Sequence, residues 1–130
     1  MAWTLYDYRS ARGENNVLEW CKRLQKSELA RLNQKLDLLA EKGHELSPGL
    51  LAGPLRGWKH LYKIRVNGSV AVRLIVCKGP IRMEQEYTIL FGAFERDDEL
   101  PAGILETADD CRQQVIKDQN RRGLHERATR

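Results

Sequence analysis

The residues of this chain that could support chemistry are basic side chains gathered in one stretch, residues 54–82. Between Glu45 and Glu84 the sequence contains no Asp or Glu. The same interval carries seven Lys and Arg residues: Arg56, Lys59, Lys63, Arg65, Arg73, Lys78 and Arg82. A surface of one sign repels itself, whereas a surface of mixed sign would serve solubility equally well. The imbalance favours an anionic partner, and the alternative is an outer strand face that simply carries solvated Lys and Arg.

This stretch predicts a β-hairpin. Two alternating runs flank Asn67-Gly68, a dipeptide that favours a type I′ turn because both of its residues tolerate positive φ. A period of two places on the core face Tyr62, Ile64 and Val66, then Val70, Val72, Leu74 and Val76. It places on the other face Lys59, Leu61, Lys63 and Arg65, then Ala71, Arg73 and Ile75. The hairpin is therefore expected to bring Lys63, Arg65 and Arg73 together on one basic surface.

Further elements are predicted from periodicity. Residues 2–8 alternate like an edge strand, residues 17–43 carry leucines at helical spacing, and residues 86–94 form another extended run. A break at residues 25–28 predicts two helices in a hairpin, with Ser27 capping the second, and one bent helix is the alternative. Another helix is expected from Pro101 to about Asp118.

This order predicts an α+β fold with an N-terminal strand, a two-helix hairpin, a three-stranded antiparallel sheet and a C-terminal helix. The helices are expected on one face of the sheet, which would leave the basic side chains on the other. Asn15 or Asn16 is placed to cap the first helix, and Gly43 is placed to end the second. Gly92, inside the last strand, indicates a bulge or a close approach.

The composition is that of one globular domain. The chain has 130 residues, of which 42% are hydrophobic and 31% are charged. No segment has the pattern of a membrane span or a secretory leader, so a cytoplasmic protein is expected. Cys21, Cys77 and Cys111 lie far apart, which predicts buried thiols rather than disulfides or a metal knuckle. The three histidines are scattered as well, and no metal or cofactor is predicted.

The net charge of +4 is distributed unevenly. From Lys117 onward, five basic and two acidic residues give +3, which leaves about +1 for the rest of the chain. Residues 1–118 are expected to form the domain. Residues 119–130 have little apolar content, and they are predicted to form a basic, mobile tail. The expectation of an anionic partner therefore depends on the local charge of residues 54–82.

Several short motifs, in their order and spacing, resemble the RelE/ParE toxin superfamily, specifically its phage-derived HigB-like branch. They are a Leu-rich helix ending at Gly43, Pro54-Leu55, residues 61–66, Val72-Arg73-Leu74, residues 90–94 and Pro101. The resemblance covers nearly the whole chain apart from the tail. It implies a toxin of a type II toxin–antitoxin system, most often a ribosome-dependent endoribonuclease that cuts mRNA. The implied partners are mRNA on the ribosome and a cognate antitoxin, expected to be a helix-turn-helix protein.

The resemblance also implies where the site lies. Carried over by position, the catalytic residues are Lys63, Arg65, Arg73 and Arg96. Further RNA contacts are predicted for Arg56, Lys59, His60, Lys78 and Arg82. Arg65 and Arg73 are the candidates for holding the negative charge of the phosphorane. Lys63 is a candidate general acid or base if neighbouring charges lower its pKa, with His60 and Tyr62 as alternatives.

One departure from the family pattern leaves other functions open. Relatives commonly have two basic residues where this chain has Glu95-Arg96, followed by the acidic Asp97, Asp98 and Glu99. The acidic run either repels RNA at one edge of the site or forms a solvated loop before the next helix. The alternatives are a ParE-like toxin that acts on DNA gyrase without nuclease activity, and a non-catalytic binding module of the same fold.

Overall fold

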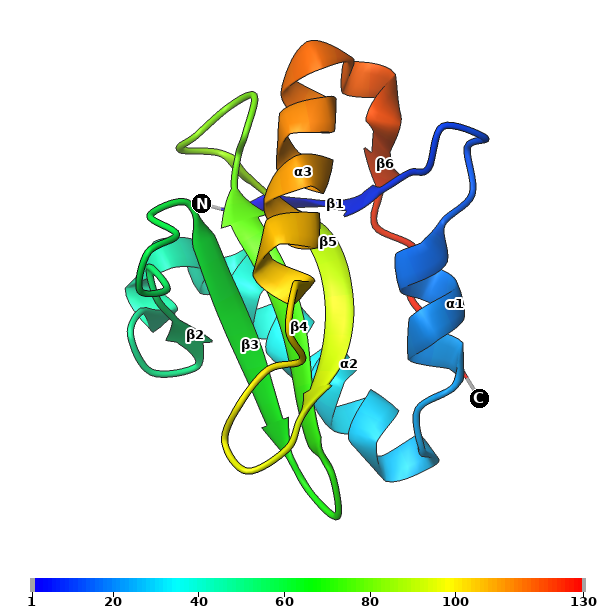
Figure 1. Cartoon of the computed structure of the whole chain (residues 1–130), viewed down its shortest axis with the longest axis vertical. Helices are drawn as coiled ribbons and strands as arrows, with labels where there is room; N and C mark the ends of the chain where they lie inside the picture. Colours follow the sequence, from blue (N-terminus) through cyan, green and yellow to red (C-terminus); the bar gives the residue numbers. More distant parts are fainter. Residues whose placement is uncertain (1, 130) are drawn as a thin grey trace.

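The computed structural model describes residues 2–129, and Met1 and Arg130 lie outside the described residues. Its elements are β1 (Thr4–Tyr8), α1 (Asn16–Lys22), α2 (Lys26–Lys42), the short 3-10 helix η1 (Gly43–Leu46), β2 (Leu51–Ala52), β3 (Leu61–Asn67), β4 (Ala71–Lys78), β5 (Glu86–Glu95), α3 (Ile104–Lys117), the 3-10 helix η2 (Gln119–Arg121) and β6 (Arg122–Leu124). The strands form one sheet in the order β2-β3-β4-β5-β1-β6 (Figure 1). The fold is mixed α+β, as predicted.

The sheet is larger than the three-stranded sheet predicted from the sequence. The predicted antiparallel core of β3, β4 and β5 is present. β1 pairs with β5 in parallel and with β6 in antiparallel orientation, so it is an interior strand and its prediction as an edge strand is wrong. β2 pairs with β3 at only two positions. The period-two pattern identified β1, β3, β4 and β5 but not the short β2 and β6. It also carries no information about which strands are neighbours.

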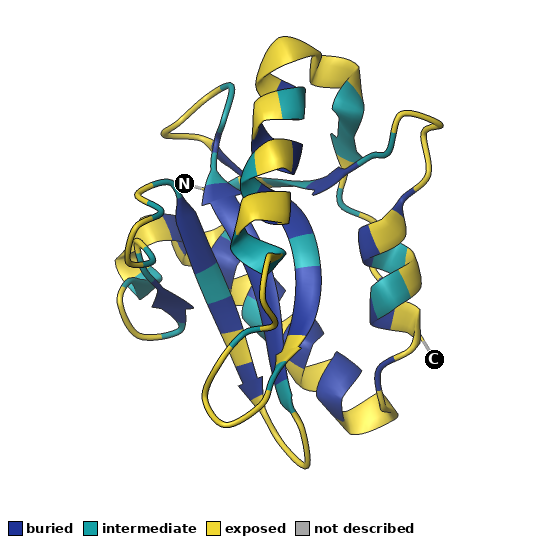
Figure 2. Ribbon diagram, viewed as in Figure 1, coloured by how far each residue is buried: buried dark blue, intermediate teal, exposed yellow. Residues whose placement is uncertain are grey.

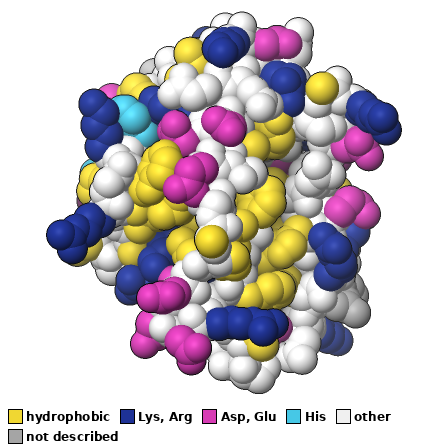
Figure 3. All heavy atoms as spheres, in the orientation of Figure 1, with side chains coloured by type: hydrophobic (Ala, Val, Ile, Leu, Met, Phe, Trp, Pro, Cys, Tyr) yellow, Lys and Arg dark blue, Asp and Glu magenta, His cyan; other side chains and the backbone are white. Residues whose placement is uncertain are grey.

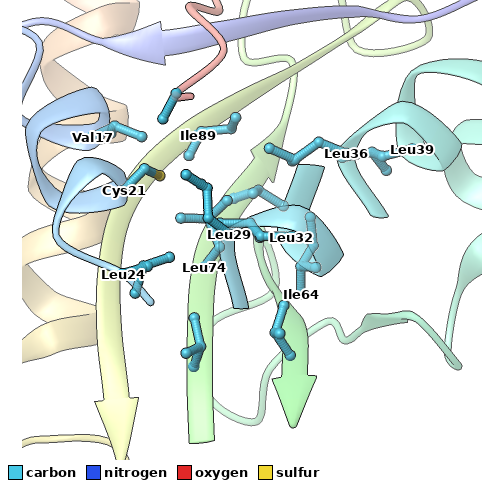
Figure 4. Packing of buried hydrophobic residues seen from close by; sticks show 14 of the residues in the cluster. Val17, Cys21, Leu24, Leu29, Leu32, Leu36, Leu39, Ile64, Leu74 and Ile89 are labelled. Carbon is cyan, nitrogen blue, oxygen red and sulfur yellow. The ribbon is translucent and has the colours of Figure 1, made fainter. Parts of the chain in front are cut away.

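The first two helices cover one face of the sheet. The predicted core residues of β3 and β4 pack there against Val17 and Cys21 of α1 and the leucines of α2 (Figure 4). Asn15 caps α1, because its side-chain Oδ1 accepts a hydrogen bond from Leu18 N at 3.0 Å. The N-cap of α2 is Gln25 rather than the predicted Ser27. Gly43 ends α2 as predicted, with φ of 56°.

The third helix covers part of the opposite face, which the sequence predicts to be open. Leu61 and Ile75 belong to the face assigned to the basic side chains, yet both are fully buried against Ala108 and Val115 of α3. As a result β4 is buried along both faces for most of its length (Figure 2). The prediction that all helices lie on one side of the sheet is wrong. The apolar residues of α3 are buried against the apolar residues of the opposite sheet face, which α1 and α2 do not cover.

The hairpin turn also differs from the prediction. The strands separate after the pair Asn67 and Ala71, so the loop has three residues, Gly68, Ser69 and Val70. Neither Asn67 nor Gly68 has positive φ, and the type I′ turn is therefore wrong. The backbone oxygen of Asn67 accepts a hydrogen bond from Arg31 Nη1 at 2.7 Å. This contact holds the turn against α2. Val70, predicted on the core face, is exposed in the loop.

The C-terminal segment is packed against the sheet, in contrast to the predicted mobile tail. β6 pairs with β1, and Ala128 is buried beside α2, where its carbonyl oxygen accepts a hydrogen bond from Asn33. Two buried carboxylates hold the segment. Asp7 contacts His125 Nδ1 at 2.8 Å and the Glu126 backbone N–H at 2.9 Å, and Glu86 pairs with Arg122. No local sequence pattern predicts these contacts, because each partner lies far away along the chain.

Among residues 2–129, no helix is long and apolar enough to cross a membrane.

Gly92 marks a close approach, as predicted. A Cβ on Gly92 would lie 2.3 Å from the indole ring of Trp20 on α1. Trp20 also packs against Phe94, with ring centroids 5.5 Å apart. The register between β4 and β5 shifts nearby, between Ile75 and Val76. The glycine therefore lets α1 lie directly on the sheet.

We expect Gly92→Ala to lower the free energy of unfolding by about 1–3 kcal/mol, because the added methyl group must displace Trp20. Denaturant unfolding measures this. Gly49→Ala is the matched control, since a Cβ there would lie 3.6 Å from Leu46 O, an ordinary contact distance. It should change stability by less than about 0.5 kcal/mol. Equal effects of the two substitutions would contradict the packing of Trp20 on Gly92.

Candidate functional site

Three charged side chains meet on the part of the sheet that α3 leaves uncovered. Glu95, the last residue of β5, receives hydrogen bonds from Lys63 Nζ at 2.6 Å and from Arg73 Nε at 2.7 Å. All three side chains are largely buried, with 15%, 7% and 5% of their surface exposed for Lys63, Arg73 and Glu95. We call this group the Lys63–Glu95–Arg73 cluster. It corrects the prediction that Lys63 and Arg73 lie on an open basic surface.

The register of the sheet explains why these residues meet. Glu95 of β5 lies opposite Ala71 of β4, which is two residues before Arg73. Lys63 of β3 lies opposite Ile75 of β4, which is two residues after Arg73. Diagonal neighbours on one sheet face are within reach of long side chains. In the sequence motifs, Glu95 stands out only as a departure from the pattern of the RelE/ParE superfamily. Extending the alternation of residues 86–94 by one residue would have placed Glu95 on the face of Arg73.

The cluster keeps Glu95 ionised. Burial raises the pKa of the Glu95 carboxyl, but the hydrogen bonds from Lys63 and Arg73 and their charges outweigh it, so the pKa lies below its ordinary value. Arg73 is further fixed by donating from Nη1 to the backbone oxygen of Val72 at 2.8 Å. The site therefore presents a carboxylate that can accept a proton, next to an ammonium and a guanidinium that can hold an anion.

The other two predicted catalytic residues are exposed. Arg65 is paired directly opposite Arg73 across the hairpin. Arg96 follows Glu95 and begins a tight turn, in which the backbone groups of Arg96 and Glu99 exchange two hydrogen bonds of 2.9 Å. Asp97 and Asp98 occupy this turn with positive φ, a conformation that Asp tolerates better than most residues. The backbone conformation of this turn therefore accounts for Asp at positions 97 and 98.

Basic side chains of α2 border the site at the free edge of β3. β2 pairs with β3 only at Lys63 and Ile64, so the later carbonyl groups of β3 have no strand neighbour on that side. Lys35 donates to the backbone oxygen of Arg65, as Arg31 does to that of Asn67. Burial lowers the pKa of Lys35, and the charges of Arg31 and Arg73 lower it further. These contacts protect the edge of the sheet beside the site.

A hollow of about 490 Å³ reaches the cluster from the hairpin end of the sheet. Its walls include Glu95, Arg96, the partly exposed Val70 and Phe94, and the buried Glu28 of α2. Glu28 is 2% exposed, and its Oε2 has no hydrogen-bond partner among the described residues. The hollow has the size of a small-ligand site and combines charged with apolar walls. No sequence pattern singles out Glu28, because an acidic residue in the first turn of a helix is common.

The five predicted RNA contacts do not form one surface. Arg56 and Arg82 are exposed, each in a loop. Lys78 pairs with Glu84 at 2.9 Å and lies near the Trp3 ring, with 5.8 Å from Nζ to the centroid. The alternation of β4 places Lys78 on the face opposite Arg73. Lys59 and His60 lie together in the turn before β3, beside α3.

The space-filling view shows the consequence for charge. On the face that carries α3, Lys and Arg side chains lie in separate groups around a central area of hydrophobic side chains, with Asp and Glu side chains between them (Figure 3). The sheet face expected to carry the basic side chains is therefore mixed in charge and partly apolar. Within residues 2–129, no group of three or more His, Cys, Asp or Glu is arranged to hold a metal ion. Cys21, Cys77 and Cys111 are buried and unpaired by disulfides, as predicted.

Comparisons of the chain with protein families, with curated proteins and with solved structures find no match. The resemblance to the RelE/ParE superfamily therefore depends on the motifs of the sequence alone.

We expect Glu95→Gln to lower the free energy of unfolding at neutral pH by about 1–3 kcal/mol, because two largely buried cations lose their counter-charge. The folded-state pKa of Glu95 is below the ordinary value of 4.5, so its contribution is complete above pH 4.5 and is lost as the pH falls through the folded-state pKa. The difference in stability between wild type and variant should therefore shrink in acid. Denaturant unfolding between pH 3 and pH 7 measures it.

The matched control is Glu84→Gln, which removes the carboxylate of another Lys–Glu pair whose Glu side chain is 79% exposed. Exposed ion pairs contribute little to the free energy of unfolding. The stability of this variant should therefore match that of the wild type at every pH. A Glu95→Gln protein that is as stable as wild type across the whole range would show that the cluster is held by packing rather than by charge.

Proposed function

We propose that this protein is a toxin of the RelE/ParE type that cleaves RNA at the Lys63–Glu95–Arg73 cluster. The observation that supports this most directly is the cluster itself, a largely buried carboxylate hydrogen-bonded to two cations at 2.6 Å and 2.7 Å. Burying such groups is costly, and an apolar set of similar volume would serve stability at least as well. Cleavage of RNA by its own 2′-hydroxyl needs a proton acceptor, a proton donor and cations for the phosphate.

The three side chains can supply these roles. The Glu95 carboxylate takes the proton of the 2′-hydroxyl, and the 2′-oxygen forms a bond to the adjacent phosphorus. The bond from phosphorus to the 5′-oxygen breaks, and the leaving oxygen takes a proton from the Lys63 ammonium. The products are a 2′,3′-cyclic phosphate and a 5′-hydroxyl. Arg73 and the exposed Arg65 opposite it stabilise the negative charge of the phosphorane through guanidinium hydrogen bonds.

The position of Glu95 makes it a poor base until RNA binds. Lys63 and Arg73 hold its pKa down, and only 5% of its side chain is exposed. A phosphate group that draws these cations toward itself removes hydrogen bonds from the carboxylate, which raises the Glu95 pKa and strengthens it as a base. Binding of the substrate and activation of the base are therefore coupled.

The proposed partners follow from the same assignment. The substrate is mRNA on the ribosome, and a cognate helix-turn-helix antitoxin neutralises the toxin through an acidic segment. The exposed Arg65 and Arg96 favour this segment electrostatically and accelerate its association. Such an association should slow as the salt concentration rises.

A second function is favoured by one observation. Glu95 neutralises much of the charge of Lys63 and Arg73 in the free protein, which suits a ParE-like toxin that binds DNA gyrase without cutting RNA. The two functions differ in a direct readout. Induction of the nuclease leaves cut transcripts, whereas induction of the gyrase-directed toxin arrests growth with intact mRNA.

We expect Arg65→Ala to reduce transcript cleavage by about 10²–10³-fold, because one donor to the phosphorane is lost. Arg65 is exposed, so the variant should stay within about 0.5 kcal/mol of wild-type stability. Arg65→Lys should recover part of the activity, since an ammonium keeps the charge but not the two parallel hydrogen bonds. Growth arrest on induction and primer extension on translated transcripts measure the effect.

Arg12→Ala is the matched control, because Arg12 is an exposed arginine in the loop between β1 and α1. It should arrest growth and cut transcripts like the wild type. Full cleavage by a folded Arg65→Ala protein would place the site elsewhere. Growth arrest without cleavage by the wild type would replace the nuclease with the gyrase-directed function.

A further inference from the structure

A second hollow, of about 480 Å³, lies between α3 and the turn that precedes β3. Residues 57–60 form one wall, with Trp58, Lys59 and His60, and α3 forms the other, with Asp109 and Arg112. It is separate from the hollow that reaches Glu95, and the two share no lining residue. Three basic side chains, those of Lys59, His60 and Arg112, thus line one space against the single carboxylate of Asp109.

Arg112 is the unusual member of this group. The residue is 8% exposed, and its Nε has no hydrogen-bond partner within residues 2–129. Its guanidinium approaches Asp109 Oδ1 at 3.7 Å, which is an ion pair but too long for a hydrogen bond. Buried guanidinium groups are normally hydrogen-bonded, because an unsatisfied one keeps the full cost of its lost hydration. Arg112 thus lines the hollow with a guanidinium that has one N–H group without a partner and only a long ion pair to Asp109.

The electrostatics of the hollow agree with this geometry. The charged groups that face His60 are Lys59 in its own turn and Arg112 and Asp109 on α3. Burial lowers the pKa of His60, the charges of Arg112 and Lys59 lower it further, and Asp109 acts in the opposite direction. The positive charges outweigh the single carboxylate at the His60 ring, so a bound anion would be stabilised there.

We propose that this hollow binds a phosphate group of single-stranded RNA, held by Arg112, Lys59 and His60, as a second phosphate subsite beside the cluster. The assignment to RNA rests on the proposed function. His60 immediately precedes β3 and Lys63 lies three residues further, a separation of about 10 Å along an extended strand. Arg65 lies two residues further along β3, so one strand of RNA that runs along β3 can contact both the hollow and the Lys63–Glu95–Arg73 cluster. Trp58, half-buried in the wall, offers an aromatic surface on which a base can stack.

The first experiment uses inorganic phosphate and the His60 ring. Phosphate bound in the hollow should raise the pKa of His60, and an NMR titration with and without phosphate measures this shift. Asp109→Asn should strengthen phosphate binding, because it removes the one carboxylate of the hollow. Arg112→Gln should weaken it by about tenfold, the loss expected for a charge-assisted hydrogen bond. An unchanged His60 pKa in wild type at saturating phosphate would overturn the proposal.

Two further variants keep the test independent of folding. Lys59 is exposed, so Lys59→Gln should fold normally and still weaken phosphate binding. Lys117→Gln is the matched control, since Lys117 is a cation of α3 that does not line the hollow. It should bind phosphate like the wild type. Equal weakening by Lys59→Gln and Lys117→Gln would indicate general charge rather than a site and would overturn the proposal.

The second experiment uses a hexauridylate oligonucleotide to separate RNA from free phosphate. Arg112→Gln should lower its affinity by about tenfold and reduce the slope of log affinity against log salt by about 0.7, the value for one contact on a single strand. An unchanged affinity would overturn the assignment to RNA. If the wild type binds the oligonucleotide through Arg112 but leaves transcripts uncut on induction, the nuclease proposal fails and this subsite stands.

Discussion

The structure depends on the burial of β4 on both of its faces. From Val72 to Cys77 every residue of this strand is buried. Val72, Leu74 and Val76 pack against α1 and α2, whereas Ile75 and Cys77 pack toward α3. A central strand of this kind requires apolar cover on each side, which fixes where all three helices lie. Arg73 is the exception within the run, and its charge has to be satisfied inside the protein.

The charged cluster follows from that constraint. A buried guanidinium is stable only with a hydrogen-bonded counter-charge, and the register of the sheet makes Glu95 that partner. Lys63 then completes a group in which one carboxylate faces two cations. The ion pairs that allow Arg73 to be buried also form the proposed site. They hold a proton acceptor, Glu95, within hydrogen-bond distance of a proton donor, Lys63, and an anion-binding group, Arg73. Stability and the proposed chemistry therefore draw on the same three side chains.

The sequence predicted what depends on local pattern and failed where partners are distant. Alternation identified β3, β4 and β5 and the core face of Ile64 and Leu74. Residue type identified Gly43 as a helix end and Asn15 or Asn16 as a cap, of which Asn15 is the cap in the structure. It placed Leu61 and Ile75 on the correct face of the sheet, but could not reveal that α3 covers that face. The mobile tail was inferred from low apolar content, yet the segment is held mainly by polar contacts to Asp7 and Glu86. Arg112 was missed because charge counts do not distinguish a satisfied guanidinium from one without a partner.

The position of β1 has a consequence for how the chain is made. Residues 4–8 are synthesised well before their neighbours in the sheet, which are β5 and β6. Until then the strand has no partner on either side, and its Leu5 and the preceding Trp3 have no completed core against which to pack. Contacts between such distant segments slow folding and leave strand edges open to other chains. Among the strands of this sheet, β1 is thus synthesised earliest but paired among the last, so its edges stay open for longer than those of the other strands.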